Sequence, residues 1–195
     1  MRIDIEDDAA KTPVSIRHGI RHGRQTTVTT GMAPGFLQAN LVVLPHAWAD
    51  EFEAFCEANA KACPLLERSA PGDPRLPSLG EDIDVRTDLP RYRVFRDGIE
   101  TEEATDISEL WQDDFVTFAL GCSYSFEGAL LEAGIPVRHL EQGVKVCTYL
   151  TGVDTVPAGR FSGKLVVSMR IFTGPNAIRA IEVTSRFPRV HGAPI

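Results

Sequence analysis

Residues 121–127, with the sequence GCSYSFE, place a thiol, two serine hydroxyl groups and a carboxyl group directly before an apolar run. Small polar residues in this position are typical of a helix start, because their oxygens accept the free backbone N–H groups. We predict a tight turn followed by a short helix over residues 126–133, which Gly134 ends. The amides of such a turn could hold an anionic ligand beside groups that transfer protons.

Periodic patterns predict several further elements. Apolar runs rich in β-branched residues predict strands over residues 36–44, 144–151 and 164–172. An apolar face predicts a helix over residues 47–60, formed by Trp48, Phe52, Phe55 and Cys56. The segment 177–184 fits neither period cleanly, and the preceding Pro175 favours a helix.

The middle of the chain combines a loop, a hairpin and another predicted helix. Prolines around residues 71–77 predict a long, shaped loop. Alternation after Pro90 predicts an exposed strand that enters a turn at Asp97 and Gly98. A capping box at Asp106 predicts a helix start, and an apolar stripe extends this helix to near Gly121: Ile107, Leu110, Trp111, Phe115 and Phe118.

The N-terminal region is polar, and residues 1–15 are expected to be a flexible segment. Residues 16–23, with the sequence IRHGIRHG, are basic and form either a short helix or an ordered arm. His18 and His22 are four residues apart, which suits either a metal pair or, because Gly19 weakens the helix, two surface side chains. The other histidines and the cysteines show no recognised ligand spacing, so no metal is predicted.

Interleaved strands and helices place the chain in the α/β class, bordering on α+β, with a mixed β-sheet flanked by helices. The 195 residues suit a single domain over residues 16–195, or two intimately packed lobes. A formal charge of −7 argues against nucleic acid as a partner. No apolar run approaches the ~18 residues that span a bilayer.

The cysteines and the first residues bear on localisation. Cys56, Cys63, Cys122 and Cys147 form no CxxC pair, which suits reduced thiols better than disulfides. The acidic N-terminus has no apolar signal region. We therefore expect a cytoplasmic protein, and association into a homodimer is left open.

Seven strings occur in an order that resembles the D-glutamate cyclase family, whose bacterial members are described as hydro-lyases. They are GFLQANL (35–41), CPLLE (63–67), DVRTDLPRYRV (84–94), GCSYSFE (121–127), VVSMR (166–170), TSRFP (184–188) and HGAP (191–194). The resemblance covers residues 16–195 and implies an α/β fold of two lobes and an activity that eliminates water. Family members continue past the HGAP string, so the resemblance implies that this chain lacks their C-terminal segment.

The resemblance also implies a substrate class, a small carboxylic acid. Animal relatives convert D-glutamate to 5-oxo-D-proline, and bacterial members could use another acid. Ring closure is intramolecular and needs no nucleotide, and neither phosphate-binding glycine pattern is present, so no cofactor is expected. The alternative function is a non-catalytic protein that binds a small anionic metabolite. A structural domain without activity is a third alternative.

Water loss requires acid–base groups and a fixed site for the substrate carboxylate. Glu127 is the predicted proton-transfer group, with Ser123 and Ser125 orienting the substrate; the alternative is that Glu127 only complements a helix dipole. Cys122 is either a nucleophile or a small buried thiol. A base for it could come from His139 or His191 if the fold brings one close.

The remaining candidates are cationic or amide side chains. Arg170, Arg186 and Arg86 are predicted carboxylate ligands, although Asp84 and Asp88 could simply pair with Arg86. His191 is a candidate base near neutral pH or an ordinary loop histidine. Two amides either contact substrate or tie down loops, and these are Gln38 and Asn40. Lys145 could form a Schiff base or lie solvated at a strand edge.

Overall fold

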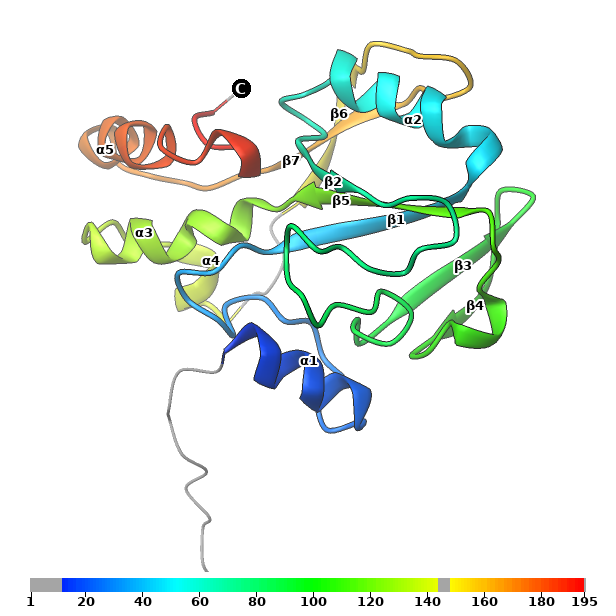
Figure 1. Cartoon of the computed structure of the whole chain (residues 1–195). Coiled ribbons are helices and arrows are strands. Elements are labelled where there is room, and N and C mark those ends of the chain that lie inside the picture. The colour runs from blue at the N-terminus through cyan, green and yellow to red at the C-terminus, as the bar shows by residue number, and fades with distance from the viewer. Residues whose placement is uncertain (1–11, 144–147, 195) are drawn as a thin grey trace, which may run out of the picture.

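A computed structural model of the protein describes residues 12–143 and 148–194 (Figure 1). The helices are α1 (Pro13–Arg21), α2 (His46–Ala58), α3 (Glu127–Glu132), α4 (Arg138–Glu141) and α5 (Gly174–Thr184). Single turns of 3₁₀ helix are η1 (Ser108–Leu110), η2 (Ser123–Phe126) and η3 (Pro188–Val190). The predictions for Lys145, for Cys147 and for the first part of the strand expected at residues 144–151 lie outside the described residues.

The strands form three small sheets. The central sheet has the order β1 (Ala39–Pro45), β5 (Phe115–Gly121) and β2 (Leu65–Arg68). Two hairpins accompany it, β3 (Tyr92–Arg96) with β4 (Ile99–Ala104), and β6 (Thr148–Asp154) with β7 (Lys164–Ser168). The predicted strands, the hairpin turn at Asp97 and the helices near residues 47–60 and 177–184 are therefore confirmed in outline.

The helix predicted from Asp106 to near Gly121 is wrong. The capping interaction exists, because Ser108 N donates to Asp106 Oδ1 at 2.7 Å, but only the one turn of η1 follows it. The chain then extends into β5, whose residues are almost all buried because both faces of the strand are covered. A strand covered on both faces reads as a continuous apolar run, which periodicity alone does not distinguish from a buried helix.

The same error accounts for the wrong prediction of a mixed sheet. Strand β1, helix α2 and strand β2 follow one another, which predicts a parallel pair of strands. Instead β5 lies between β1 and β2 and runs antiparallel to both, with Ala39 opposite Gly121 and Leu65 opposite Leu120. Every strand pairing within residues 12–143 and 148–194 is antiparallel.

Hydrophobic packing covers both faces of β5. Figure 1 shows α2 on one side of the central sheet and α1 on the other. On the α2 side, Val116 and Phe118 pack with Ala49, Phe52 and Cys56 of the helix, as the predicted apolar face requires. The opposite side is covered by the proline-containing loop, through a cluster of Leu66, Leu76, Val85 and Ala119. Alternate side chains of one strand therefore enter two different clusters.

Helix α1 confirms the helical reading of the basic segment and begins at Pro13, inside the predicted N-terminal segment. Thr12 caps it by accepting from Ser15 N at 3.2 Å, and proline suits the first helical position. Arg17 and Arg21 form ion pairs with Asp82 and Asp88 in the loop below the sheet. These ion pairs fix α1 on the loop, and we refer to them as the α1 ion-pair cluster.

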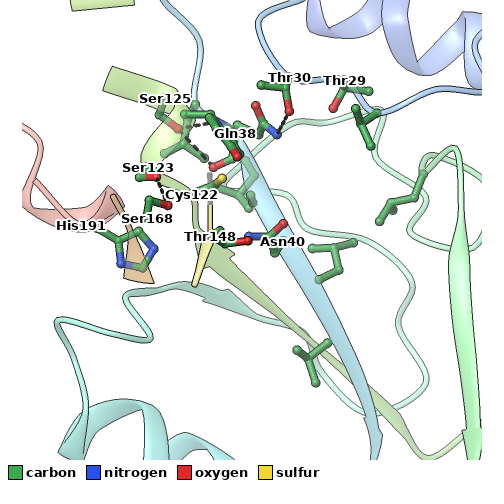
Figure 2. Close-up of a pocket in the computed structure, with 18 of the residues that line it drawn as sticks. Thr29, Thr30, Gln38, Asn40, Cys122, Ser123, Ser125, Thr148, Ser168 and His191 are labelled. Atoms are coloured by element: carbon green, nitrogen blue, oxygen red, sulfur yellow. Dashed lines mark hydrogen bonds between the residues drawn. The ribbon is translucent and has the colours of Figure 1, made fainter. Parts of the chain in front are cut away.

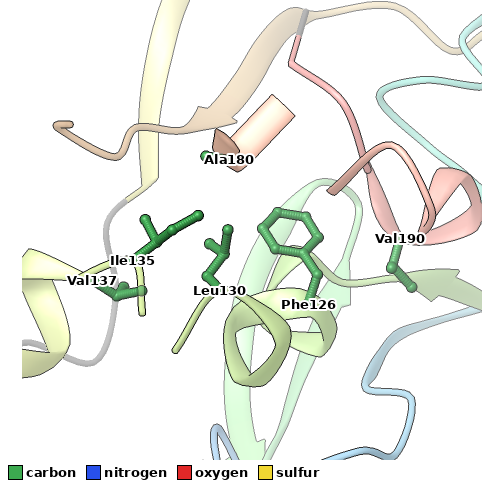
Figure 3. Close-up of a cluster of buried hydrophobic side chains, with 6 residues drawn as sticks. All are labelled: Phe126, Leu130, Ile135, Val137, Ala180 and Val190. Atoms are coloured by element: carbon green, nitrogen blue, oxygen red, sulfur yellow. The ribbon is translucent and has the colours of Figure 1, made fainter. Parts of the chain in front are cut away.

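A third hydrophobic cluster joins α3 to α5 and η3, and Figure 3 shows its six buried residues: Phe126, Leu130, Ile135, Val137, Ala180 and Val190. Gly134 ends α3 with φ 69°, as predicted. In that conformation Ile135 N reaches Leu130 O at 2.9 Å, and the chain turns back into the cluster. This cluster fixes the start of α3, where Glu127 lies.

The hairpin of β6 and β7 exposes several apolar side chains, among them Leu150 and Val166. Its contribution to the site comes from the end of β7, where Ser168 and the following Arg170 point away from solvent. The arrangement of two lobes stays a prediction. No helix within residues 12–143 and 148–194 is long and apolar enough to cross a bilayer.

Candidate active site

The turn predicted at residues 121–127 lies where β5 ends and η2 begins. Gly121 permits this arrangement, because a Cβ there would lie 2.0 Å from Arg189 O. Only glycine lets η3 approach the end of the strand so closely. The string therefore joins the central sheet to the cluster of α3, α5 and η3, as Figure 1 shows at the end of β5.

The backbone amides of this turn are mostly used within the protein. Cys122 N donates to Gln38 O at 3.1 Å, and Ser125 N donates to Cys122 O at 3.1 Å. Ser125 Oγ accepts from Gln38 N at 2.8 Å and donates to Gln38 O at 3.2 Å. At least two amides of the expected cradle, those of Cys122 and Ser125, are therefore bonded within the protein, and the binding of a ligand by the other amides of the turn stays a prediction.

Glu127 and Arg170 form a buried ion pair beside the turn. The Arg170 guanidinium donates to Glu127 Oε1 from Nε at 3.0 Å and from Nη2 at 2.5 Å. The two side chains are only 6% and 9% exposed. Arg170 also lies over the Phe126 ring, 5.1 Å from its centroid. Because both charged groups are buried and each compensates the charge of the other, this contact is held rigidly.

Two serines extend this ion pair into a polar network. Arg170 Nη2 donates to Ser123 Oγ at 3.2 Å, and Ser123 Oγ lies 3.2 Å from Ser168 Oγ. The network brings together Ser123, Glu127 and Arg170, which are 47 residues apart at most and come from η2, α3 and the end of β7. Figure 2 shows the contact between the two serines at the edge of the pocket.

His139 of α4 reaches the same carboxylate. Its Nε2 lies 3.1 Å from Glu127 Oε1, although the direction does not meet the requirements of a hydrogen bond. The ring packs edge to face on Tyr124, with centroids 6.1 Å apart. The sequence analysis considered His139 only as a base for Cys122. A single histidine in a short helix gives no periodic signal, so the pairing with Glu127 could not be found from sequence.

We refer to the region around Ser123, Glu127 and Arg170 as the corner. Cys122 is a buried thiol there, only 6% exposed. Burial raises its pKa, and this outweighs the opposing effects of the Tyr124 backbone, the Asn40 side chain and the Arg170 charge. A raised pKa keeps the thiol protonated near neutral pH, and the thiol is a far weaker nucleophile than the thiolate. The geometry therefore favours the second interpretation of Cys122, a small buried side chain.

His191 lies close to the turn but uses both ring nitrogens for packing. Nδ1 is 2.9 Å from Lys61 O and Nε2 is 2.7 Å from Gly121 O, with φ of His191 at 68°. Carbonyl oxygens only accept hydrogen bonds, so the ring nitrogen that carries the hydrogen donates to one of these two carbonyls. Both ring nitrogens therefore face backbone oxygens, and the role of His191 as a base stays a prediction.

The turn opens onto a broad pocket of about 2950 Å³. Gln38, Asn40, Ser123, Ser125 and Glu127 line it, and so do other predicted site residues: Cys122, Arg170 and His191. Figure 2 shows polar side chains near the turn that come from several elements, among them Asn40 of β1, Thr148 of β6 and Ser168 of β7. Sites for small molecules usually measure about 300–1,000 Å³, so a small acid would fill only one corner of this space.

Arg86 and Arg186 do not join the corner. Arg86 forms a two-pronged ion pair with Asp84, at 2.9 and 2.7 Å, and this contact lowers the pKa of the Asp84 carboxyl. Arg186 is exposed and donates to Val183 O at 3.3 Å. Neither lines the pocket. Arg186 follows an apolar run as Arg170 does, and Arg86 lies in a loop between two aspartates, but of the three only Arg170 contacts Glu127.

No group of three or more histidine, cysteine, aspartate or glutamate side chains capable of holding a metal ion occurs within the described ranges. His18 and His22 stack with ring centroids 4.2 Å apart, and His22 Nδ1 lies 2.7 Å from His18 O. The corner is therefore built from a carboxylate, a guanidinium, an imidazole and hydroxyl groups. Groups of these kinds can transfer protons and hydrogen-bond small polar molecules, as in the sites of acid–base enzymes.

Comparison with known proteins agrees with this class. A family model described as D-glutamate cyclase matches residues 116–195. A protein of Bordetella pertussis named "Putative hydro-lyase" is 59% identical over 175 residues, which are 90% of this chain and 63% of the relative. One of Rhizobium johnstonii with the same description is 53% identical over 190 residues, 97% of this chain and 71% of the relative.

The chain belongs to the D-glutamate cyclase family. It spans 63% of the length of the Bordetella relative. The matched residues 116–195 include the turn, Glu127, His139, Ser168 and Arg170, so the corner lies entirely within the part that the family model recognises.

Proposed function

We propose that the protein is a hydro-lyase that removes water from a small carboxylic acid at the corner formed by Glu127, Arg170 and Ser123. One observation carries the proposal: a buried carboxylate, fixed by a guanidinium, lines a pocket beside the hydroxyl groups of Ser123 and Ser168. The family description and the names of the relatives support the same class of reaction.

Elimination of water moves protons from the substrate to the hydroxyl group that leaves. A carboxylate in a water-poor corner can accept a proton and return it. Arg170 balances the charge of Glu127, so a second carboxylate, that of the substrate, can approach without meeting an uncompensated negative charge. The hydroxyls of Ser123 and Ser168 lie beside the ion pair and can hold the oxygens of the substrate.

The specific reaction that we propose is closure of D-glutamate to 5-oxo-D-proline. The amine nitrogen attacks the γ-carboxyl carbon, a C–N bond forms, and a C–O bond breaks. The ammonium loses two protons, and both end in the water that leaves with the carboxylate oxygen. A single acid–base group that takes protons from nitrogen and gives them to oxygen can therefore serve the whole reaction, and Glu127 is placed for this role.

The alternative function, binding of an anionic metabolite without reaction, is less well supported. A binding protein would be expected to offer Arg170 to the ligand. Here two of its nitrogens are committed to Glu127 and one of these also contacts Ser123. Calorimetry on the same samples as the product assay separates binding from turnover.

The test measures water loss from D-glutamate, L-glutamate and small hydroxy acids by mass spectrometry of the products. We expect Glu127→Gln to lower turnover by about 10²- to 10⁴-fold, which is the usual contribution of a positioned acid or base. Glu182→Gln is the matched control, because Glu182 is an exposed residue of α5. Full activity in Glu127→Gln, or no turnover of any acid by the unsubstituted chain, would overturn the proposal.

Loss of the Glu127 charge leaves Arg170 buried without its partner, so folding needs a separate check. Glu127→Asp keeps the charge but shortens the side chain by one methylene group. We expect this variant to fold, as judged by circular dichroism, and to lose turnover because the carboxylate is withdrawn from the substrate.

A further inference from the structure

We propose that His139 is a positioning residue for Glu127. Its Nε2–H donates to Oε1 and completes a set of three nitrogen donors on that one oxygen, so that Oε2 is the atom that exchanges protons with the substrate. The inference deepens the proposed function and rests on it for the role of Oε2. The pairing of His139 with Glu127 stands on geometry alone.

The Glu127 carboxylate is contacted unequally at its two oxygens. Arg170 Nε, Arg170 Nη2 and His139 Nε2 all approach Oε1, at 3.0, 2.5 and 3.1 Å. Among the contacts recorded between described residues, none reaches Oε2. A carboxylate oxygen that already accepts strong hydrogen bonds is a poor base, because a proton would have to displace them. The unequal contacts therefore assign proton transfer to Oε2.

His139 is buried in a way that calls for a hydrogen bond. Its side chain is 9% exposed, and Nε2 is inaccessible to solvent with no hydrogen-bond partner in the present ring orientation. A buried polar nitrogen left without a partner costs free energy. Oε1 of Glu127 lies 3.1 Å from Nε2, which is within hydrogen-bond distance, so we infer that the His139 ring turns to donate an Nε2–H to this oxygen.

The fold fixes the positions of His139 and Glu127 relative to each other. Val137, two residues before His139, is fully buried in the same hydrophobic cluster as Phe126 and Leu130, which flank Glu127 (Figure 3). The Tyr124 ring packs on the imidazole from η2, and Arg170 approaches from the end of β7. The segments that carry Tyr124, Glu127 and His139 are therefore anchored in this cluster. Such support is what keeps an acid–base group within the narrow geometry that proton transfer requires.

The first experiment does not depend on activity. A long-range ¹H–¹⁵N NMR spectrum shows which ring nitrogen of a histidine carries a proton, and the His139 signals are assigned by their loss in His139→Gln. We expect Nε2 to be protonated at pH 7, and its resonance to shift in Glu127→Gln. A ring protonated only at Nδ1, or an Nε2 resonance indifferent to Glu127→Gln, would overturn the inference even if the enzyme is active.

The second experiment separates a donor from a space-filling ring. His139→Gln keeps an N–H near the position of Nε2, whereas His139→Phe keeps the ring on Tyr124 but removes the donor. We expect His139→Phe to lower kcat by about ten- to a hundredfold with little change in KM, and His139→Gln to retain most of kcat. If His139 only filled space, His139→Phe would retain more of kcat than His139→Gln. Inactivity of the unsubstituted chain would remove the proposed function, while the NMR result would still decide the pairing.

Discussion

Two buried carboxylates in this protein, Glu127 and Asp88, are both paired with arginine but differ in how completely they are satisfied. Asp88 uses both oxygens: Oδ1 accepts from Arg21 Nε at 2.5 Å, and Oδ2 accepts from Arg21 Nη2 at 2.7 Å and from Asp84 N at 2.9 Å. Glu127 has all its recorded contacts with described residues on Oε1. The two groups are similarly buried, at 7% and 5% exposed.

The difference teaches that burial and an ion pair do not by themselves mark a functional carboxylate. In the α1 ion-pair cluster, both Asp88 oxygens accept hydrogen bonds, two from a helix residue and one from the backbone of the loop. At the corner, the recorded donors among the described residues all meet Oε1 of Glu127, and our proposal assigns proton exchange to the other oxygen. An acid–base group needs a fixed position and an unoccupied atom at the same time.

The largest expected effect of this contrast concerns stability at Asp88. Replacing Asp88 with Ala leaves the Arg21 Nε–H and the Asp84 N–H without their recorded acceptor, so we expect the free energy of unfolding to fall by about 3 kcal/mol. Turnover per folded molecule should not change. Urea denaturation measures the first effect, and Glu81→Ala, an exposed acidic residue nearby, is the control. A loss similar to that of the control would contradict the structural role.

A smaller effect is expected on acid unfolding. The hydrogen bonds from Arg17 lower the pKa of the Asp82 carboxyl. A carboxyl with a lowered pKa in the folded state stabilises the protein above its unfolded pKa of about 3.9, and this contribution is lost as the pH falls through the folded value. Arg17→Met should therefore make stability fall less steeply below about pH 4. Urea midpoints between pH 5 and 2 test this, with Arg96→Met, from an exposed ion pair, as the control.

The smallest expected effect concerns thiol reactivity at the corner. Burial raises the pKa of Cys122, whereas a hydrogen bond with Cys56 lowers the pKa of the partly exposed Cys63. Iodoacetamide should label Cys63 before Cys122 in the native protein, as peptide mapping would show, because the thiolate is the reactive form. Cys122→Ala should retain turnover. Equal labelling rates together with an inactive Cys122→Ala would restore Cys122 as a nucleophile candidate.

Local sequence signals predicted the elements whose cause is local. Pro45 and the spacing of Phe52 and Cys56 define α2, the Asp97-Gly98 pair marks the hairpin, and Gly134 ends α3 because it accepts a positive φ. The turn at residues 121–127 was placed correctly for the same reason. Strand β5 was mistaken for a helix, because residues buried on both faces give neither period.

The candidate site likewise combines residues that the sequence revealed with contacts that it did not reveal. The polar turn and Glu127 were visible in the sequence, as were three candidate arginines, two of which follow apolar runs. Which arginine faces the carboxylate depends on how the hairpin of β6 and β7 lies against α3, and only Arg170 does so. The sequence also did not reveal that Gln38, from a distant segment, accepts a hydrogen bond from Cys122 N and donates one to Ser125 Oγ.

The amino-acid sequence alone determined the chemical groups of this protein, its local turns and helix ends, and its resemblance to the D-glutamate cyclase family. These depend on residue type and on neighbours within a few positions. The tertiary structure decided that β5 enters the sheet between β1 and β2, and that Glu127, Arg170 and His139 meet at one oxygen. Contacts between residues this far apart along the chain arise only when several hydrophobic clusters pack together. The local sequence pattern does not predict that packing.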